Sequence, residues 1–151
     1  MQLYRIGKCR YIDDTSGKGA ALYGGRWNSV GTKVLYTAGS GALAMLEALV
    51  NLPNLKITDP YCLVVLEVPD ASIKETKAAD LPEGWNSFPA PEALRQTGDT
   101  FIKEGKYLIL KVPSAIMPLE ANYIINPLHP LFSKIKVVQK ERLEFDKRLL
   151  K

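Results

Sequence analysis

The chain has little of the chemistry that metal sites and histidine-based catalysis require. Its 151 residues include one histidine and two cysteines. The single histidine, His129, excludes a histidine-cluster metal site and any Ser-His or Cys-His nucleophile that does not use it as the base. Cys9 and Cys62 are far apart in the sequence and have neither metal-ligand nor redox-pair spacing, so a reducing compartment is the simplest expectation. We therefore expect no metal site.

Segments that direct a protein to a membrane or out of the cell are also absent from the sequence. The chain starts Met1-Gln-Leu-Tyr-Arg5, without a basic and apolar leader. The uncharged stretch 34–46 is well short of the roughly 20 apolar residues that span a bilayer. Walker and Rossmann glycine motifs are missing as well. We expect a cytoplasmic protein that uses neither of these nucleotide-binding motifs.

The composition is that of an ordinary globular protein. Hydrophobic residues make up 46% and charged residues 24% of the chain, which excludes a disordered chain. The length predicts a single domain over residues 1–151. The net charge of +4 mildly favours an anionic ligand. Much of that charge lies in the C-terminal tail, where it alternates with acidic residues, and this mixture is typical of a solvated surface rather than a nucleic-acid stripe.

Hydrophobic periodicity predicts more strands than helices. Helices are expected over 40–52 and 91–104, with Gly98 unfavourable inside the second and a loop over 81–91. Strands are expected at Leu3–Ile6, Val34–Thr37, Leu63–Val68, Tyr107–Val112, Ala121–Ile125 and Ile135–Val138. Strands and helices do not alternate regularly, which argues against a doubly wound fold. We expect an α+β protein with a compact mixed sheet and flanking helices.

Glu47 is the only charged residue between Lys33 and Lys56. It lies on the same helical face as Leu43 and Val50, in a segment that is hydrophobic nearly all round and is therefore expected to be buried. An ionised carboxylate there costs several kcal/mol unless it is paired or faces a polar cleft. A buried structural ion pair and a catalytic acid in a pocket are equally compatible with this pattern.

A second group of candidate binding residues lies in the segment Tyr23-Gly-Gly-Arg-Trp-Asn-Ser-Val-Gly31. Its glycines permit a tight turn or a close approach to a ligand, and Arg26 offers a planar set of donors for phosphate or carboxylate. Trp27 and Asn28 add a stacking surface and an amide. The alternative is a surface turn in which Trp27 fills the core and Arg26 pairs with a carboxylate such as Glu47.

Six motifs in this order resemble the RES domain family, which is named after an arginine, a glutamate and a serine. They are Gly25-Arg-Trp-Asn28, Val34-Leu-Tyr36, the helix that carries Glu47, Val112-Pro-Ser114, Asn122-Tyr123 with Asn126-Pro-Leu-His-Pro130, and Phe145-Asp-Lys-Arg-Leu149. The resemblance spans nearly the whole chain, from Tyr4 to Leu149, and it is weakest over residues 70–88.

The resemblance implies a toxin of a bacterial toxin-antitoxin pair with a fold similar to ADP-ribosyltransferase toxins. Family members consume NAD+ as a substrate, by hydrolysis or phosphorolysis of the nicotinamide-ribose bond, and some modify proteins by ADP-ribosylation. No further cofactor is implied. The implied partner is an Xre-type helix-turn-helix antitoxin, through which alone the toxin would meet DNA; a homodimer is left open. The family's site corresponds to Arg26, Tyr36, Glu47 and Ser114.

The expected chemistry fits these residue types. Cleavage of the nicotinamide-ribose bond develops positive charge on the ribose, and the leaving group is neutral, so one carboxylate suffices. We expect Glu47 to bind the ribose hydroxyls and stabilise that charge. Arg26 would hold a phosphate. Tyr36 would stack on the nicotinamide or serve as a core aromatic, and Ser114 would bond a ribose or phosphate oxygen or cap its own turn.

Arg5 and Asn122 are further candidates for the NAD+ pocket. Two rival functions remain: an ADP-ribosyltransferase that modifies a specific protein, and a non-catalytic module that binds an anion or RNA. The binding module predicts aromatic residues interleaved with lysine and arginine on one face, which the C-terminal tail does not offer. The sequence does not separate hydrolysis, phosphorolysis and transfer, because the same pocket serves all three.

Overall fold

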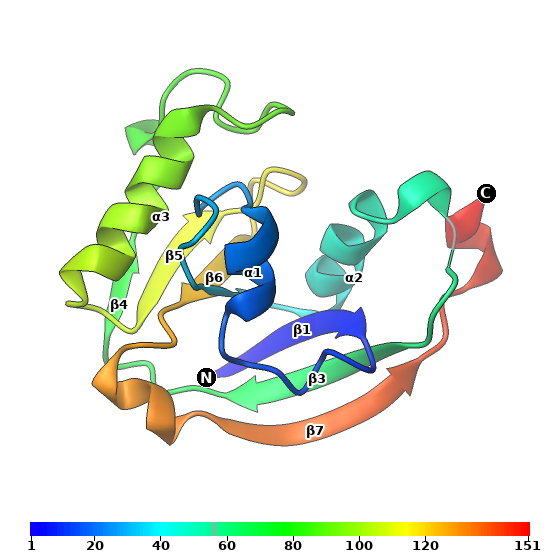
Figure 1. Cartoon of the computed structure of the whole chain (residues 1–151). Helices are drawn as coiled ribbons and strands as arrows, with labels where there is room; N and C mark the ends of the chain where they lie inside the picture. Colours follow the sequence, from blue (N-terminus) through cyan, green and yellow to red (C-terminus); the bar gives the residue numbers. More distant parts are fainter. Residues whose placement is uncertain (56) are drawn as a thin grey trace.

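The computed structural model describes residues 1–55 and 57–151 as a curved sheet with three α-helices (Figure 1). The helices are α1 (Lys18–Tyr23), α2 (Gly41–Val50) and α3 (Glu92–Glu104). The strands are β1 (Gln2–Lys8), β2 (Leu35–Ala38), β3 (Tyr61–Glu67), β4 (Ile73–Glu75), β5 (Ile109–Pro113), β6 (Ala121–Ile125) and β7 (Lys136–Leu143). Short 3-10 turns occur at Pro53–Leu55, Ala78–Asp80, Pro130–Lys134 and Lys147–Leu150.

The described strands form one sheet in the order β4-β5-β6-β2-β1-β3-β7. All neighbouring strands are antiparallel except β4 and β5, which are parallel. The central strands β6, β2 and β1 come from distant parts of the sequence, so the sheet brings residues near 5, 36 and 122 together. The α+β class with a mixed sheet, predicted from the sequence, is confirmed.

Helix α3 packs against the β5–β6 half of the sheet through an apolar face that carries Leu94 and Phe101. Gly98, on the same buried face, allows the helix to approach the loop over residues 24–31, called the Arg26 loop below, closely. A Cβ atom at this position would overlap the backbone carbonyl of Trp27. The residue that was unfavourable for a helix is therefore the one that allows α3 to reach the loop.

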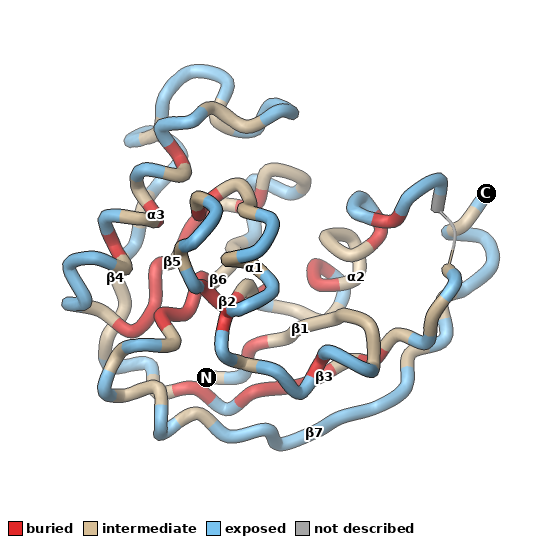
Figure 2. The backbone as a smooth tube through the Cα atoms, viewed as in Figure 1, coloured by how far each residue is buried: buried red, intermediate tan, exposed pale blue. Residues whose placement is uncertain are grey.

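Helix α2 packs on β1 and β2 and leaves its other face open. Ser40 caps its N-terminus by accepting a hydrogen bond from the N–H of Leu43. Leu43, Ala44 and Leu49 are buried, whereas Val50 is 62% exposed. The expectation that this helix is buried all round was therefore wrong, because only one face has a sheet to cover it. Figure 2 shows buried residues concentrated in β3, β5 and β6, whereas β7 is exposed along most of its length.

The secondary structure predicted from the sequence was largely correct. All six expected strands and both expected helices are present, and 81–91 contains no helix or strand. Their ends lie within two residues of the prediction except for β7, which continues to Leu143 instead of ending at Val138. The pattern missed α1 and β4, which are six and three residues long. Such short elements give too few turns or alternations to be recognised. None of the described helices has the length and apolarity needed to cross a membrane.

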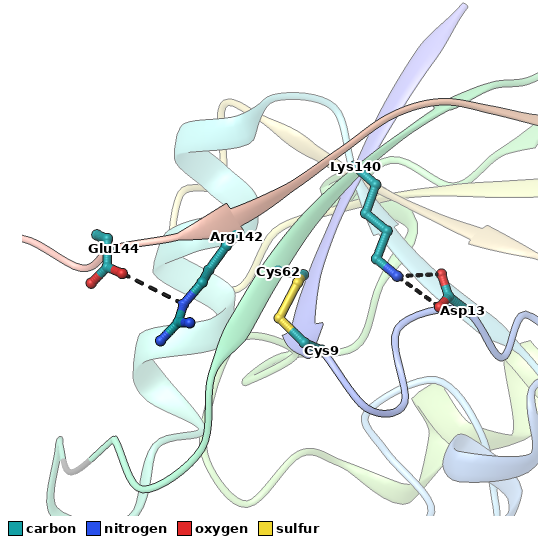
Figure 3. The surroundings of a disulfide bond; sticks show 6 residues. All are labelled: Cys9, Asp13, Cys62, Lys140, Arg142 and Glu144. Carbon is teal, nitrogen blue, oxygen red and sulfur yellow. Dashed lines mark hydrogen bonds and ion pairs between the residues drawn. A yellow bond between two sulfur atoms is a disulfide. The ribbon is translucent and has the colours of Figure 1, made fainter.

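Cys9 and Cys62 form a disulfide, although their spacing in the sequence did not indicate a pair (Figure 3). The physical reason is the antiparallel pairing of β1 with β3. That register places Gly7 opposite Cys62, and the N–H of Cys9 donates to the carbonyl of Pro60. Cysteines that are distant in sequence thus become neighbours across the sheet, and the argument for a reducing compartment loses its basis.

Candidate functional site

A cleft of about 1240 Å³ opens between α2 and the segments that contain α1, the Arg26 loop and the start of α3. Its floor includes residues of β1, β2 and β6, and its walls carry Glu47 on one side and Arg26 on the other. Figure 1 shows α1 and α3 on one side of this region and α2 on the other. Clefts that bind small molecules typically have volumes of about 300–1,000 Å³, so this one accommodates a large ligand.

Glu47 of α2 is half-buried and lines the cleft. Its Oε1 atom accepts two hydrogen bonds, from the Ser114 hydroxyl at 2.9 Å and from the Asn122 amide Nδ2 at 2.6 Å. Its Oε2 atom has no hydrogen-bond partner among the described residues. The carboxylate is thus fixed through one oxygen, and the other is available to a ligand.

Ser114 lies behind Glu47 rather than on the cleft surface, with an exposed fraction of 0%. Its Oγ accepts hydrogen bonds from the backbone N–H groups of Ile116 and Met117, at 3.1 and 3.2 Å. Both lone pairs of the hydroxyl are therefore used, and its single proton points to Glu47. The geometry makes Ser114 both the cap of its own turn and a donor to the carboxylate.

Asn122 donates to Glu47 from β6, the strand beside β2. A donor of this kind to a carboxylate forms a charge-assisted hydrogen bond, which is stronger than one between neutral groups. The reversed amide would place its oxygen against Glu47 and create repulsion, so the carboxylate fixes the orientation of Asn122. The amide oxygen Oδ1 is buried and has no partner among the described residues.

Arg26 faces Glu47 across the cleft but is held by the loop that follows β4. Its Nη1 atom donates to the carbonyls of Trp85 and Ser87, at 2.8 and 2.9 Å. Among the described residues, Arg26 and Glu47 form no ion pair with each other. Burial lowers the pKa of Arg26, whereas the nearby Glu47 carboxylate opposes that shift. The guanidinium stays charged and keeps its remaining donors for a ligand.

Tyr36 joins the Arg26 loop to the floor of the cleft. Its hydroxyl accepts from the Trp27 N–H at 3.0 Å and donates to Asn28 Oδ1 at 2.6 Å. Burial raises the pKa of Tyr36, so the phenol stays protonated. A Cβ atom on Gly25 would lie 2.7 Å from this hydroxyl, which explains the need for glycine beside Arg26. Trp27 and Asn28 are both buried, so Trp27 is part of the core and offers no stacking surface.

Arg5 reaches the same cleft from β1. Its Nη1 atom donates to the carbonyl of Ile12 at 2.6 Å. Burial lowers the pKa of Arg5, and the negative charges of Asp14 and Asp13 oppose this effect. Arg5 therefore adds a second cation to the cleft.

Asp99 of α3 fixes the far end of the Arg26 loop. It accepts from the Ser29 N–H at 2.9 Å and from the Ser29 hydroxyl at 2.5 Å. Burial acts to raise the pKa of Asp99, but the hydrogen bonds from Ser29, with a contribution from Thr32, outweigh it and hold the pKa below its ordinary value. Together with Gly98, this carboxylate attaches the loop to α3.

The structure brings the six predicted site residues, Arg5, Arg26, Tyr36, Glu47, Ser114 and Asn122, to one cleft, with Ser114 buried behind it. Sequence reasoning missed the two carbonyls that hold Arg26 and the Asp99 contact. Backbone carbonyls occur at every residue and give no sequence signal. Asp99 occupies a helical position that is equally typical of a solvated surface.

Comparison with known proteins decides the family. A family model described as RES domain matches residues 2–146. The chain belongs to the RES domain family. It is 38% identical over 151 residues to "Toxin Res" of Yersinia enterocolitica, with 99% of each chain covered. It is also 39% identical over 142 residues to "Prs ADP-ribosylating toxin" of a Sphingobium strain, covering 92% of this chain and 88% of that protein.

One solved structure supports the fold assignment. The RES chain resembles a chain in the crystal structure of the M. tuberculosis MbcT-MbcA toxin-antitoxin complex, with a TM-score of 0.73 and 20% sequence identity. The match covers 94% of this chain and 83% of the other. This similarity confirms the predicted RES, ADP-ribosyltransferase-like fold.

Proposed function

We propose that this RES protein is a toxin that cleaves the nicotinamide-ribose bond of NAD+. The observation that carries the proposal is the Glu47 carboxylate on the cleft wall, whose Oε1 atom is fixed by two donors and whose Oε2 atom has no hydrogen-bond partner among the described residues. Loss of neutral nicotinamide needs no general acid, so a positioned negative charge beside the ribose is the main requirement. The names of the relatives, which include "Toxin Res", agree with a toxin.

Each residue of the cleft has a role in this mechanism. Glu47 Oε2 accepts from a ribose hydroxyl and stabilises positive charge as the glycosidic bond breaks. Ser114 and Asn122 orient that carboxylate before substrate arrives, so little reorganisation is needed in the transition state. Arg26 binds a phosphate through the donors that the 85–87 loop does not use. Tyr36 lines the cleft beside it and fixes the Arg26 loop.

Transfer of ADP-ribose to a protein is the second candidate. The relative named "Prs ADP-ribosylating toxin" favours it, because that protein and this chain match over most of their lengths. The same cleft can supply an ADP-ribosyl cation to water, to phosphate or to a protein side chain. Only the acceptor differs among these reactions.

The deciding experiment uses the purified chain and NAD+. Released nicotinamide is measured with and without inorganic phosphate, and the ribose product is identified by mass spectrometry. ADP-ribose indicates hydrolysis, ADP-ribose 1″-phosphate indicates phosphorolysis, and a mass increase on an added protein indicates transfer. A folded preparation that leaves NAD+ intact under all three conditions would refute the proposal.

An antitoxin and a cytoplasmic location complete the proposal. The complex named in the similar structure supports a partner that binds the toxin, and we propose an Xre-type helix-turn-helix protein whose tail covers Arg26 and Glu47. The cytoplasm supplies the NAD+ pool. A purified complex that turns over NAD+ as fast as the toxin alone would refute occlusion of the cleft.

A further inference from the structure

Phe88 is a large apolar side chain that the folded chain leaves in solvent. It is 93% exposed and yet it lines the cleft, together with Asn86 of the same loop. An exposed phenyl ring contributes almost nothing to the hydrophobic stability of the fold, because it is not removed from water. Its position at the cleft therefore calls for a role outside folding.

The position of Phe88 is imposed by its neighbours. Trp85 and Ala90, on either side of it, pack against the core cluster that contains Trp27 and Leu94. The carbonyls of Trp85 and Ser87 are bound by Arg26. Within the loop, the Ser87 N–H donates to the Gly84 carbonyl at 2.9 Å. The backbone on both sides of the ring is thus held, and Phe88 projects from a fixed loop.

The first turn of α3 places a cation close to this loop. Arg95 is half-buried and lines the cleft. Across the described ranges, its guanidinium forms neither a hydrogen bond nor an ion pair with another residue. A half-buried guanidinium with free donors is suited to a phosphate group. The phenyl ring of Phe88, the amide of Asn86 and the guanidinium of Arg95 therefore all line the cleft on the wall opposite Glu47.

We propose that Phe88, Asn86 and Arg95 form a second subsite of the cleft, which binds the purine base of the dinucleotide and the phosphate next to it. The inference rests on the proposed function and deepens it. Glu47 acts on the ribose that bears nicotinamide, so the other nucleotide must lie elsewhere in the cleft. Phe88 stacks on its base, Asn86 offers hydrogen bonds to the edge of the base, and Arg95 binds the phosphate. Arg26 binds the loop that carries Phe88, so the residue that holds a phosphate also positions the ring that stacks on the base.

The first test does not depend on turnover. Binding of AMP and of ribose 5-phosphate is measured by calorimetry for the wild type, Phe88→Ala, Phe88→Tyr and Phe88→Leu. Stacking on one aromatic side chain corresponds to roughly tenfold in affinity. We expect Phe88→Ala and Phe88→Leu to weaken AMP binding by about this factor and to leave ribose 5-phosphate unchanged, whereas Phe88→Tyr retains AMP. Arg95→Gln should weaken both ligands, because both carry the phosphate.

Tyr11→Ala is the matched control, since Tyr11 is an aromatic residue that is 60% exposed and does not line the cleft. It should bind AMP like the wild type. Melting temperatures of the Phe88 variants should equal that of the wild type because the ring is in solvent. AMP affinity that is unchanged in Phe88→Ala, or equally reduced in Tyr11→Ala, overturns the subsite.

The second test compares NAD+ with nicotinamide mononucleotide, which lacks the adenosine half. Phe88→Ala should raise the KM for NAD+ roughly tenfold at unchanged kcat, and it should leave the KM for the mononucleotide unaltered. Equal losses on both substrates overturn the subsite. If the wild type turns over neither substrate while AMP binding follows the expected pattern, the proposed function fails and the subsite stands. If Phe88→Ala weakens only a protein partner, the residue is a partner contact and the subsite is overturned.

Discussion

Replacement of Glu47 by glutamine separates its charge from its shape. The amide oxygen of glutamine can occupy the place of Oε1 and still accept from Ser114 and Asn122. The group that faces the cleft then becomes an NH2 donor in place of a negatively charged oxygen. Positive charge that develops on the ribose loses its stabiliser, and we expect kcat to fall by roughly a hundredfold or more.

The stability of this variant should change little. Two charge-assisted hydrogen bonds become neutral ones, a loss of about 1–2 kcal/mol, and the smaller desolvation of an amide offsets part of it. At about 2–4 °C per kcal/mol for a chain of this size, the full loss would lower the melting temperature by about 2–8 °C, and the offset makes the expected fall smaller. If Glu47 formed a buried ion pair with Arg26, removal of its charge would instead lower the free energy of unfolding by about 3–5 kcal/mol. Arg26 is bound to the carbonyls of Trp85 and Ser87 rather than to Glu47.

The assay combines nicotinamide release with thermal unfolding, for Glu47→Gln and for Glu104→Gln. Glu104 is exposed at the end of α3, so its variant changes the net charge equally and should keep both rate and melting temperature. A Glu47→Gln protein that unfolds ~10 °C lower and retains its rate in the folded fraction would show that Glu47 supports the fold rather than the reaction.

Three further predictions concern the supports of the site. Ser114→Ala leaves two backbone N–H groups of the following turn unpaired, so the free energy of unfolding should fall by about 2 kcal/mol, together with the rate; urea titrations that match the wild type would contradict the hydrogen-bond pattern. Gly98→Ala should cost about 3 kcal/mol because its Cβ overlaps the Trp27 carbonyl, whereas Gly19→Ala in α1, where a Cβ meets nothing within 4 Å, should gain about 0.5–1 kcal/mol. Equal melting temperatures for these two variants would disprove the close approach of α3. The pKa of Asp99 is below its ordinary value of 3.8 in the folded state, so its contribution to stability is present above that value and is lost as the pH falls through the folded pKa. The difference in unfolding free energy between wild type and Asp99→Asn should therefore shrink as the pH is lowered from 6 to 2, and a constant difference would exclude this linkage.

The sequence was most informative where the periodic pattern is long. The strands over 63–68 and 121–125 and the helix that ends at Gly105 are visible because each has enough alternations or turns. Four of the site residues were predicted from the family resemblance of the ordered motifs rather than from periodicity, and Arg5 and Asn122 were further candidates for the same pocket. Glu47 is the exception, because a single charge on an apolar helix already indicates either a partner or a cleft.

The features that the sequence did not reveal depend on contacts between distant segments. Cys9 and Cys62 pair only through the register of β1 and β3. The open face of α2 results from the sheet covering one side of an apolar helix. The sequence correctly predicted irregular structure over 81–91. The loop holds Arg26 through two backbone carbonyls, and because every residue has such a carbonyl, the sequence does not indicate this role.

The hydrogen bonds to Glu47 span 67 and 75 residues of sequence, and this separation has a consequence during synthesis. A growing chain in which β1, β2 and α2 have left the ribosome already carries Arg26, Tyr36 and Glu47. The carboxylate gains its second donor, Asn122, only after β6 has been made and has paired with β2. Domains fold as units while ribosomes add about 5–20 residues per second. Incomplete products that lack β6 therefore lack one of the two donors that hold Glu47, and the candidate site is completed only late in translation. A partner that covers the cleft, as proposed above, can therefore act on each molecule from the time at which β6 is added to the sheet.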